Sequence, residues 1–206
     1  LERCHCSVEL RTQEICKRKA AFWLSAGSLG RAICCTGLRS QSSQGDEVIV
    51  SLIRDMGGQV EGKTELTACP SDLVGRVIDV EDCPDLVPVL TVLASCAKGI
   101  TRIIHAGRVR LKECDRLHAM ATELNKIGGD IEEEDEGLII HGVGSFTGGT
   151  VSGWNDHRIA MALAVASQRC RQPLRIEGAE CVRKSYPEFW QDFQALGGML
   201  QKDVEE

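Results

Sequence analysis

The stretch LHAMATELNKIGG, residues 117–129, indicates the fold, because its ending, an apolar residue followed by two glycines, occurs twice more in the chain. Its apolar residues are spaced by three and four positions, which predicts a helix with one buried face. A Gly-Gly pair follows the last apolar residue, as expected for a left-handed helix cap. Two further Gly-Gly pairs, at 57–58 and 197–198, follow apolar residues that lie 71 positions before and 69 positions after Ile127.

Two kinds of helix are therefore expected. Apolar residues with helical spacing precede the other Gly-Gly pairs, which predicts amphipathic helices near 48–56 and 189–196. Before each amphipathic helix comes a segment that is apolar nearly all round, at 19–29, 85–97 and 157–167. Helices without a polar face belong inside a core.

Short β-rich stretches complete a repeating unit. Three of these stretches, at 32–36, 101–105 and 174–177, come after the buried helices. A fourth, at 137–141, comes after a Gly-Gly pair. Each unit reads strand, buried helix, strand, amphipathic helix, strand, strand. The sequence therefore predicts an α/β fold of three repeated units packed around buried helices, with the sheets outside. Residues 142–153 are rich in Gly, Ser and Thr and are expected to form a loop or a turn-linked hairpin.

Composition excludes several classes of protein. Hydrophobic residues make up 43% of the 206 residues, as in a globular protein. The net charge of -6 argues against a general nucleic-acid binder. No apolar run is long enough for a transmembrane helix, so no membrane partner is expected. Glu2, Glu9 and Glu14 fit neither a signal peptide nor an acid-poor transit peptide. We expect a cytoplasmic protein.

The eleven cysteines are scattered along the chain. Four of them lie inside apolar runs, at Cys34, Cys35, Cys96 and Cys170. Buried free cysteine behaves as a small hydrophobic residue, so most are interpreted as reduced thiols. The run Cys4-His5-Cys6 with Cys16 lacks the paired spacing of zinc ligands, and no metal is expected there.

Charged residues gather just before or at the start of the helices: Asp85, Lys112, Glu113, Arg116, His157, Arg158 and Lys184. Helix N-termini favour anions. Arginine binds carboxylates and phosphates with two hydrogen bonds, and lysine acts as a point charge. A site built from these cations suits a small anion with several charges, and the two carboxylates beside them could exchange protons.

Each of these residues also has a purely structural interpretation. Glu113 and Arg116 have the spacing of a surface ion pair worth about 0.2–0.5 kcal/mol. Asp85 could be a helix cap, His157 a first-turn polar residue and Lys184 a solvated loop lysine. The residues by themselves leave these alternatives open. They predict an α/β repeat domain that could bind anions.

Several motifs together carry a family resemblance. The runs 82–85, 112–117, 155–162 and 184–187 appear in the order in which they occur in the C-terminal domain of EPSP synthases. Residues 44–46 and 20–24 also match that family. The resemblance covers about 19–198, so we assign 1–18 to an atypical N-terminal segment and 19–206 to a C-terminal-type domain. The family has two similar domains, each built from three units, and the N-terminal domain is absent here.

The resemblance implies an activity and a role for each site residue. The family joins phosphoenolpyruvate to the 5-hydroxyl of shikimate 3-phosphate and releases phosphate, without a metal or organic cofactor. Asp85 would accept the hydroxyl proton, and Glu113 would transfer a proton near the phosphoenolpyruvate methylene. Arg116, Arg158 and Lys184 would hold phosphoenolpyruvate, Lys112 would contact the shikimate phosphate, and His157 would line the same site.

The missing half limits the expected activity. In the family the active site lies between the two domains, so this chain would supply one side of it. Positioning two reactants contributes about 7–11 kcal/mol, much of which half a cleft forfeits. We expect a chain that is inactive without a separately made N-terminal half, its expected partner. The alternative is a non-catalytic domain, derived from the enzyme, that binds anions or a protein.

Overall fold

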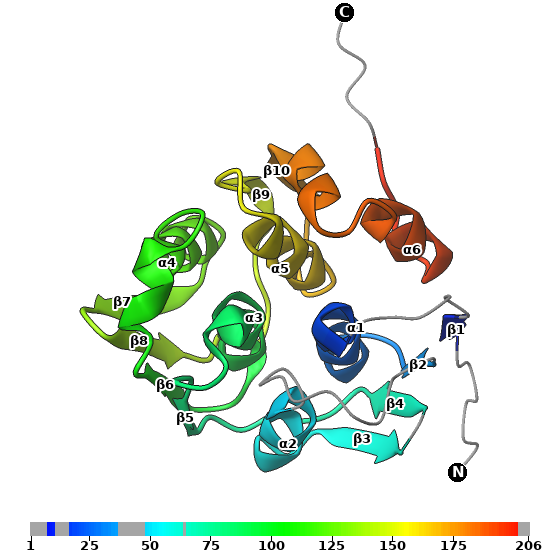
Figure 1. Ribbon diagram of the computed structural model, residues 1–206, viewed down its shortest axis with the longest axis horizontal. Helices are drawn as coiled ribbons and strands as arrows, with labels where there is room; N and C mark the ends of the chain where they lie inside the picture. Colours follow the sequence, from blue (N-terminus) through cyan, green and yellow to red (C-terminus); the bar gives the residue numbers. More distant parts are fainter. Residues whose placement is uncertain (1–7, 11–16, 37–47, 64, 202–206) are drawn as a thin grey trace, which may run out of the picture.

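Three helices lie at the centre of the molecule and sheets surround them in the computed structural model, which describes residues 8–10, 17–36, 48–63 and 65–201 (Figure 1). The central helices are α1 (Lys17–Leu29), α3 (Val87–Cys96) and α5 (His157–Ser167), and each contacts the other two. In α3, the hydroxyls of Thr91 and Ser95 donate to carbonyls one turn earlier, so the buried polar groups are satisfied. The predicted α/β class is confirmed.

Two four-stranded sheets share one topology. The first contains β1 (Val8–Leu10), β2 (Ile33–Cys35), β3 (Gln59–Gly62) and β4 (Leu66–Cys69), in the order β1-β2-β4-β3. The second contains β5 (Val77–Asp79), β6 (Ile100–Ile104), β7 (Asp130–Glu134) and β8 (Gly137–His141), in the order β5-β6-β8-β7. In both sheets the first two strands are parallel and the others antiparallel. A parallel pair requires a crossover, and α1 and α3 provide it on the core side.

The third sheet is smaller. It pairs β9 (Gly149–Ser152) with β10 (Leu174–Glu177) in parallel, joined through α5. The expected loop or hairpin over 142–153 is therefore wrong in its second half, where Thr150 and Val151 favour a strand. The repeating unit also predicts two strands after the third amphipathic helix. They are not found among the described residues, because only three described residues follow Gly198.

The amphipathic helices α2 (Val48–Asp55), α4 (Arg116–Lys126) and α6 (Phe189–Ala195) end in the same way. The first glycine of each Gly-Gly pair has a positive φ, 89° at Gly57 and Gly128 and 92° at Gly197. The N–H of the next glycine donates to a carbonyl five residues earlier, at 2.8–2.9 Å. This bond identifies the left-handed cap predicted from the sequence.

Aromatic side chains join the first and third units. The Trp23 indole of α1 donates to the Tyr186 hydroxyl at 3.1 Å and stacks on Phe189 of α6, with ring centroids 5.0 Å apart. The Tyr186 hydroxyl in turn donates to Asp192. The N-terminal and C-terminal helices of the domain therefore close the core together.

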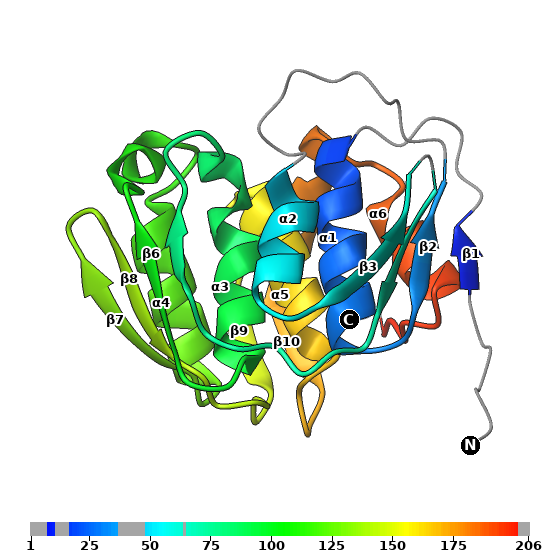
Figure 2. The ribbon, with the colours of Figure 1, turned by 90° about the horizontal axis from the view of Figure 1, so that it is seen from below.

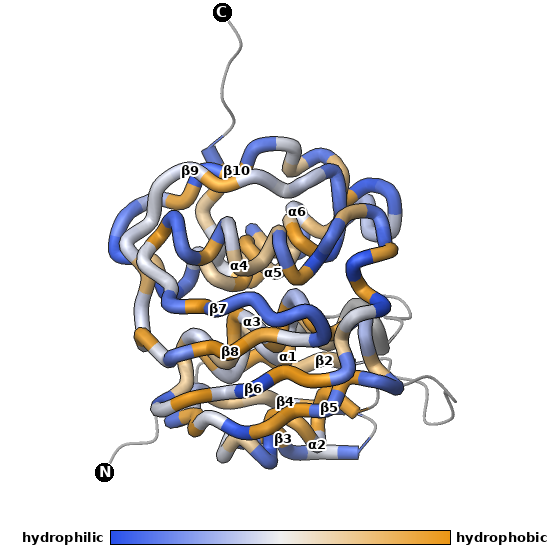
Figure 3. The backbone as a smooth tube through the Cα atoms, turned by 90° about the vertical axis from the view of Figure 1, so that its left-hand side faces the viewer, coloured by the Kyte–Doolittle hydropathy of each residue, from blue (hydrophilic) through white to orange (hydrophobic). Residues whose placement is uncertain are grey.

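The strand β7, at one edge of the second sheet, is polar. Figure 3 shows β7 as a largely hydrophilic strand, consistent with its sequence DIEEE and with exposure of most of its residues. No described helix is long and apolar enough to cross a membrane. Among the eight described cysteines none forms a disulfide, and Cys35 and Cys181 are buried.

Candidate active site

The starts of three helices meet at one end of the core. Asp85 lies in η2 (Pro84–Leu86), a 3₁₀ turn directly before α3, and Pro84 takes a first-turn position that suits proline. Arg116 is the first residue of α4 and Arg158 the second residue of α5. The helices α3, α4 and α5 contact one another, so residues far apart in the sequence come together here. Figure 2 shows α1 and α3 side by side, with this end of the core uppermost.

Asp85 is held by three cations. Its Oδ1 lies 2.9 Å from Nη1 of Arg116 and 3.5 Å from Nζ of Lys112, and its Oδ2 lies 2.9 Å from Nη2 of Arg158. Burial raises the pKa of Asp85, but the charges of Arg158 and Arg116 outweigh burial and lower it overall. The carboxylate is therefore ionised and both of its oxygens are occupied.

Arg116 is buried, with 1% of its side chain exposed, and it joins three carboxylates. Besides Asp85, it contacts Glu113 Oε2 at 2.7 Å and Asp156 Oδ2 at 2.8 Å. Burial lowers the pKa of Arg116, but bonding to Asp156 and the nearby carboxylate charges raise it overall. The alternative that Glu113 and Arg116 form a surface ion pair is wrong, because the guanidinium lies inside the protein.

Asp156 belongs to the cluster, although the sequence did not predict it as a site residue. Its side chain is fully buried and accepts a hydrogen bond from the Arg158 N–H at 2.8 Å, so it caps the start of α5. The same carboxylate accepts from Nε of Arg116, 40 residues away. The sequence contained a hint of this role. An arginine inside a core requires a carboxylate partner, and Asp156 lies within the run 155–162 that carries the family resemblance.

Glu113 and His157 lie beside the arginines. The Oε1 atom of Glu113 is 3.8 Å from Nδ1 of His157. Burial, followed by the charge of Arg158, lowers the pKa of His157, so its imidazole is neutral near pH 7. Nδ1 of His157 is buried and has no hydrogen-bond partner in the described part of the chain.

Lys184 stands at the edge of the cluster. It ends the 3₁₀ segment η4 (Ala179–Lys184), and its Nζ donates to both the carbonyl and the side-chain oxygen of Asn155 at 2.7 Å. Asn155 directly precedes Asp156, and it lies with Trp154 in the left-handed region at φ 54° and 51°. Lys184 is thus anchored beside the cluster, which differs from a purely solvated loop lysine.

The arrangement suits an anion better than a metal ion. Ligand atoms of Glu113, Asp156 and His157 lie within 4.8 Å of one another. However, the Arg116 guanidinium already bonds both carboxylates, and its charge opposes a metal cation. The whole group has four cationic side chains and three carboxylates, an excess of one positive charge. The cysteine-rich run at 4–6 and Cys16 lie outside the described residues.

Comparison with known proteins identifies the family. The family model described as EPSP synthase (3-phosphoshikimate 1-carboxyvinyltransferase) matches residues 17–193. The chain belongs to the EPSP synthase family. The resemblance inferred from the sequence motifs is thereby confirmed, although the motif at 44–46 lies outside the described residues.

The relatives compared below are longer than this chain. It is 54% identical over 185 residues to the 3-phosphoshikimate 1-carboxyvinyltransferase of Clostridium kluyveri, and the match covers 89% of this chain and 43% of the relative. The enzyme of the same name from Clostridium acetobutylicum is 51% identical over 180 residues, with 42% of it covered. A structure of Acinetobacter baumannii EPSP synthase superposes with a TM-score of 0.75 at 28% identity, over 86% of this chain and 44% of that one. The chain thus spans less than half the length of these relatives.

Proposed function

We propose that this chain is the C-terminal half of an enolpyruvyl transferase that joins phosphoenolpyruvate to shikimate 3-phosphate and releases phosphate. In this proposal the chain provides one side of the active site and an N-terminal half provides the other. Family membership and the coverage of less than half of each relative support this division. So does the excess of positive charge in the cluster, because both substrates are anions.

One observation carries the proposal: Asp85 bridges the guanidinium groups of Arg116 and Arg158. The Arg158 side chain is only 9% exposed, so both arginines are fixed before a ligand arrives. Preorganised donors of this kind stabilise charge that develops during a reaction. A carboxylate or phosphate of phosphoenolpyruvate would take over the bonds that Asp85 now makes.

The proposed chemistry is an addition followed by an elimination. Asp85 accepts the proton of the attacking hydroxyl, and Glu113 transfers a proton at the phosphoenolpyruvate methylene. Arg116, Arg158 and Lys184 hold phosphoenolpyruvate, Lys112 contacts the phosphate of the second substrate, and His157 lines the site.

Ligand exchange would also activate the base. With both oxygens bonded to cations, Asp85 has a lowered pKa and is a weak proton acceptor. When the substrate takes over the bonds that the arginines make to Asp85, the pKa of Asp85 rises and the carboxylate becomes a stronger base. The enzyme would thus gain its base only after the substrate has bound.

A second candidate function is a domain that binds anions or a protein partner without catalysis. The coverage of less than half of each relative motivates it, because a binding domain needs no second half. Under this hypothesis the arginines serve binding alone, and no turnover appears even when both halves associate.

The test is release of phosphate from phosphoenolpyruvate plus shikimate 3-phosphate. The chain is assayed alone and mixed with the N-terminal half of the Clostridium kluyveri relative. We expect turnover only in the mixture. Arg158→Lys should then lower kcat/KM by about 10²–10³, the cost of removing one preorganised donor. The matched control is Arg110→Lys, since Arg110 also bonds two carboxylates but lies outside the cluster.

Two results would contradict the proposal. Turnover by the chain alone would show that no second half is required. A lack of turnover in a mixture whose halves co-elute in size-exclusion chromatography would favour the binding domain.

A further inference from the structure

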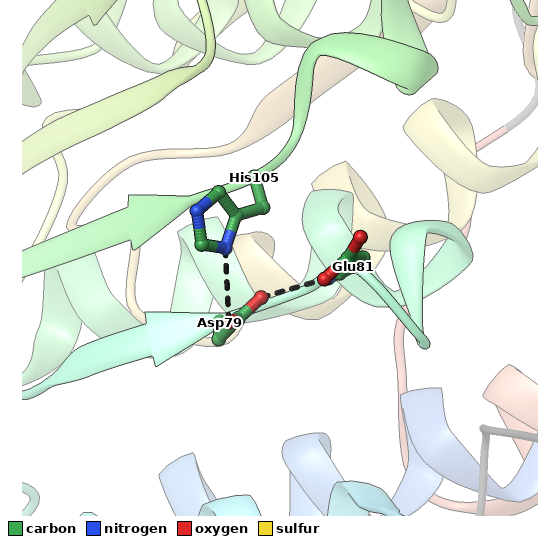
Figure 4. A group of neighbouring side chains, drawn as sticks. All are labelled: Asp79, Glu81 and His105. Atoms are coloured by element: carbon green, nitrogen blue, oxygen red, sulfur yellow. Dashed lines mark hydrogen bonds and ion pairs between the residues drawn. The ribbon is translucent and has the colours of Figure 1, made fainter.

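A second cluster of polar side chains lies at the ends of β5 and β6. Asp79 is the last residue of β5, Glu81 follows two residues later, and His105 directly follows β6. The strands are parallel, and Asp79 lies opposite Ile104, so their carboxyl ends meet at one edge of the sheet. Figure 4 shows the His105 ring above Asp79, with Glu81 beside it.

The ligand atoms of these side chains lie close together. Nδ1 of His105 is 2.9 Å from Oδ2 of Asp79, and one atom from each of the three residues fits within 4.8 Å. Zinc holds imidazole nitrogen and carboxylate oxygen at about 2.0–2.2 Å, so neighbouring ligand atoms of one ion lie roughly 3–3.5 Å apart. To bind one ion, the three side chains would have to move closer together, and the ion would replace the hydrogen bond between His105 and Asp79.

The charge around His105 favours a cation. The Asp79 carboxylate accepts a hydrogen bond from Nδ1 of His105, and the carboxylates of Glu81 and Glu136 add to the negative charge around the imidazole. Among the described residues, no lysine or arginine forms an ion pair with Asp79 or Glu81. The three carboxylates therefore give this edge of the sheet a local negative charge, which attracts a metal cation.

Two other exposed histidines provide a comparison. His118 lies 3.0 Å from Glu133, but Arg110 bonds the same carboxylate at 2.6 Å. His141 lies 3.5 Å from Glu132, which is a single carboxylate. Of the histidines outside the arginine cluster in the described ranges, His105 alone belongs to a group of three possible metal ligands.

We propose that Asp79, Glu81 and His105 bind one divalent first-row metal ion, with water completing its coordination. One imidazole and two carboxylates suit Mn²⁺, Fe²⁺, Co²⁺ or Zn²⁺ rather than a metal that requires thiolates. The site is distinct from the arginine cluster and does not depend on the proposed activity. A bound ion would fasten the end of β6 to the segment that runs from Glu81 to Asp85.

Mn²⁺ is the probe of choice because it binds oxygen and nitrogen ligands and avoids the many thiols of this chain. The whole chain is titrated with MnCl₂ and followed by paramagnetic line broadening in ¹⁵N–¹H spectra. Free Mn²⁺ is measured in parallel by electron paramagnetic resonance. We expect one saturable site, with broadening centred on residues 79–81 and 104–106.

Variants make the test specific. Loss of a supporting contact to a metal ligand typically weakens binding 10–100-fold, so His105→Ala should raise the Kd for Mn²⁺ at least about tenfold. Asp79→Asn should do the same while keeping the shape of the side chain. His118→Ala removes an equally exposed histidine with a carboxylate partner and should leave the Kd unchanged. Dispersed spectra of each variant verify that it is folded.

Three outcomes would overturn the site. Broadening centred on Glu113 and His157 would place the ion in the arginine cluster instead. An unchanged Kd in folded His105→Ala and Asp79→Asn would show that these side chains are not ligands. Failure to saturate any site would leave His105 and Asp79 as an ordinary surface ion pair.

Discussion

The side chain of Asp85 carries the main prediction at the scale of single residues. In the assembled enzyme, a base must be ionised, so the rate falls as pH falls through its pKa. The profile of kcat/KM reports the free enzyme, and the profile of kcat reports the substrate complex. Because the arginines lower the pKa of Asp85 only while they bond it, we expect the acidic limb of kcat at a higher pH than that of kcat/KM. Stopped-time assays across the acidic range measure both limbs.

The variant Asp85→Asn is the control for that assignment. It should lower kcat about 10²–10⁴-fold, the usual contribution of a positioned base, and it should remove the acidic limb of kcat. An acidic limb that persists at the same pH in Asp85→Asn would assign it to another group.

The sequence predicted most of the charged residues of the arginine cluster, but it did not predict the contacts that hold them in place. Asp85, Arg116 and Arg158 lie at helix starts, and helix starts are recognisable from capping residues and apolar spacing. The bond between Arg116 and Asp156 joins residues 40 positions apart. Such a contact depends on how α4 and α5 pack, which no local pattern encodes.

At the scale of helices and strands, Glu123 joins α4 to the start of the third unit. Its buried carboxylate accepts hydrogen bonds from the Ser152 N–H at 2.9 Å and the Trp154 indole at 2.7 Å. Burial raises the pKa of Glu123, but the bonds from Lys126, Trp154 and Ser152 lower it overall. The carboxylate therefore fixes the left-handed turn that continues to Asn155, the anchor of Lys184.

We expect Glu123→Ala to lower the free energy of unfolding by about 2 kcal/mol, because two half-buried donors lose their acceptor. Urea unfolding followed by circular dichroism measures the change. Glu132→Ala, on the exposed strand β7, should change stability by less than about 0.5 kcal/mol. Equal losses in the two variants would contradict a special role for Glu123.

The elements themselves were predictable where local chemistry decides them. The caps at Gly57, Gly128 and Gly197 follow from a glycine after an apolar helix face. The strand β9 was missed because the residues before it, rich in Gly and Ser, resemble a loop. Its pairing with β10 across α5 supplies the strand geometry, and that contact is not local.

At the scale of the whole molecule, the three units share one core because α1, α3 and α5 contact one another. We therefore expect the isolated chain to unfold in a single cooperative transition. Phe189→Ala, in the third unit, should cost about 3–5 kcal/mol and shift that transition as a whole. Thermal melts followed by circular dichroism and by tryptophan fluorescence should coincide. Two separated transitions, with only one of them moved by Phe189→Ala, would show that the units fold independently.

The small third sheet has a practical consequence. Within the described residues β10 pairs with β9 alone, whereas the corresponding strands β2 and β6 each have a neighbour on both sides. An edge strand presents backbone groups that can pair with another chain. A preparation of this domain at high concentration will therefore tend to self-associate through β10. Samples of the domain should therefore be kept dilute, or a short peptide that pairs with β10 should be added to cover its free edge.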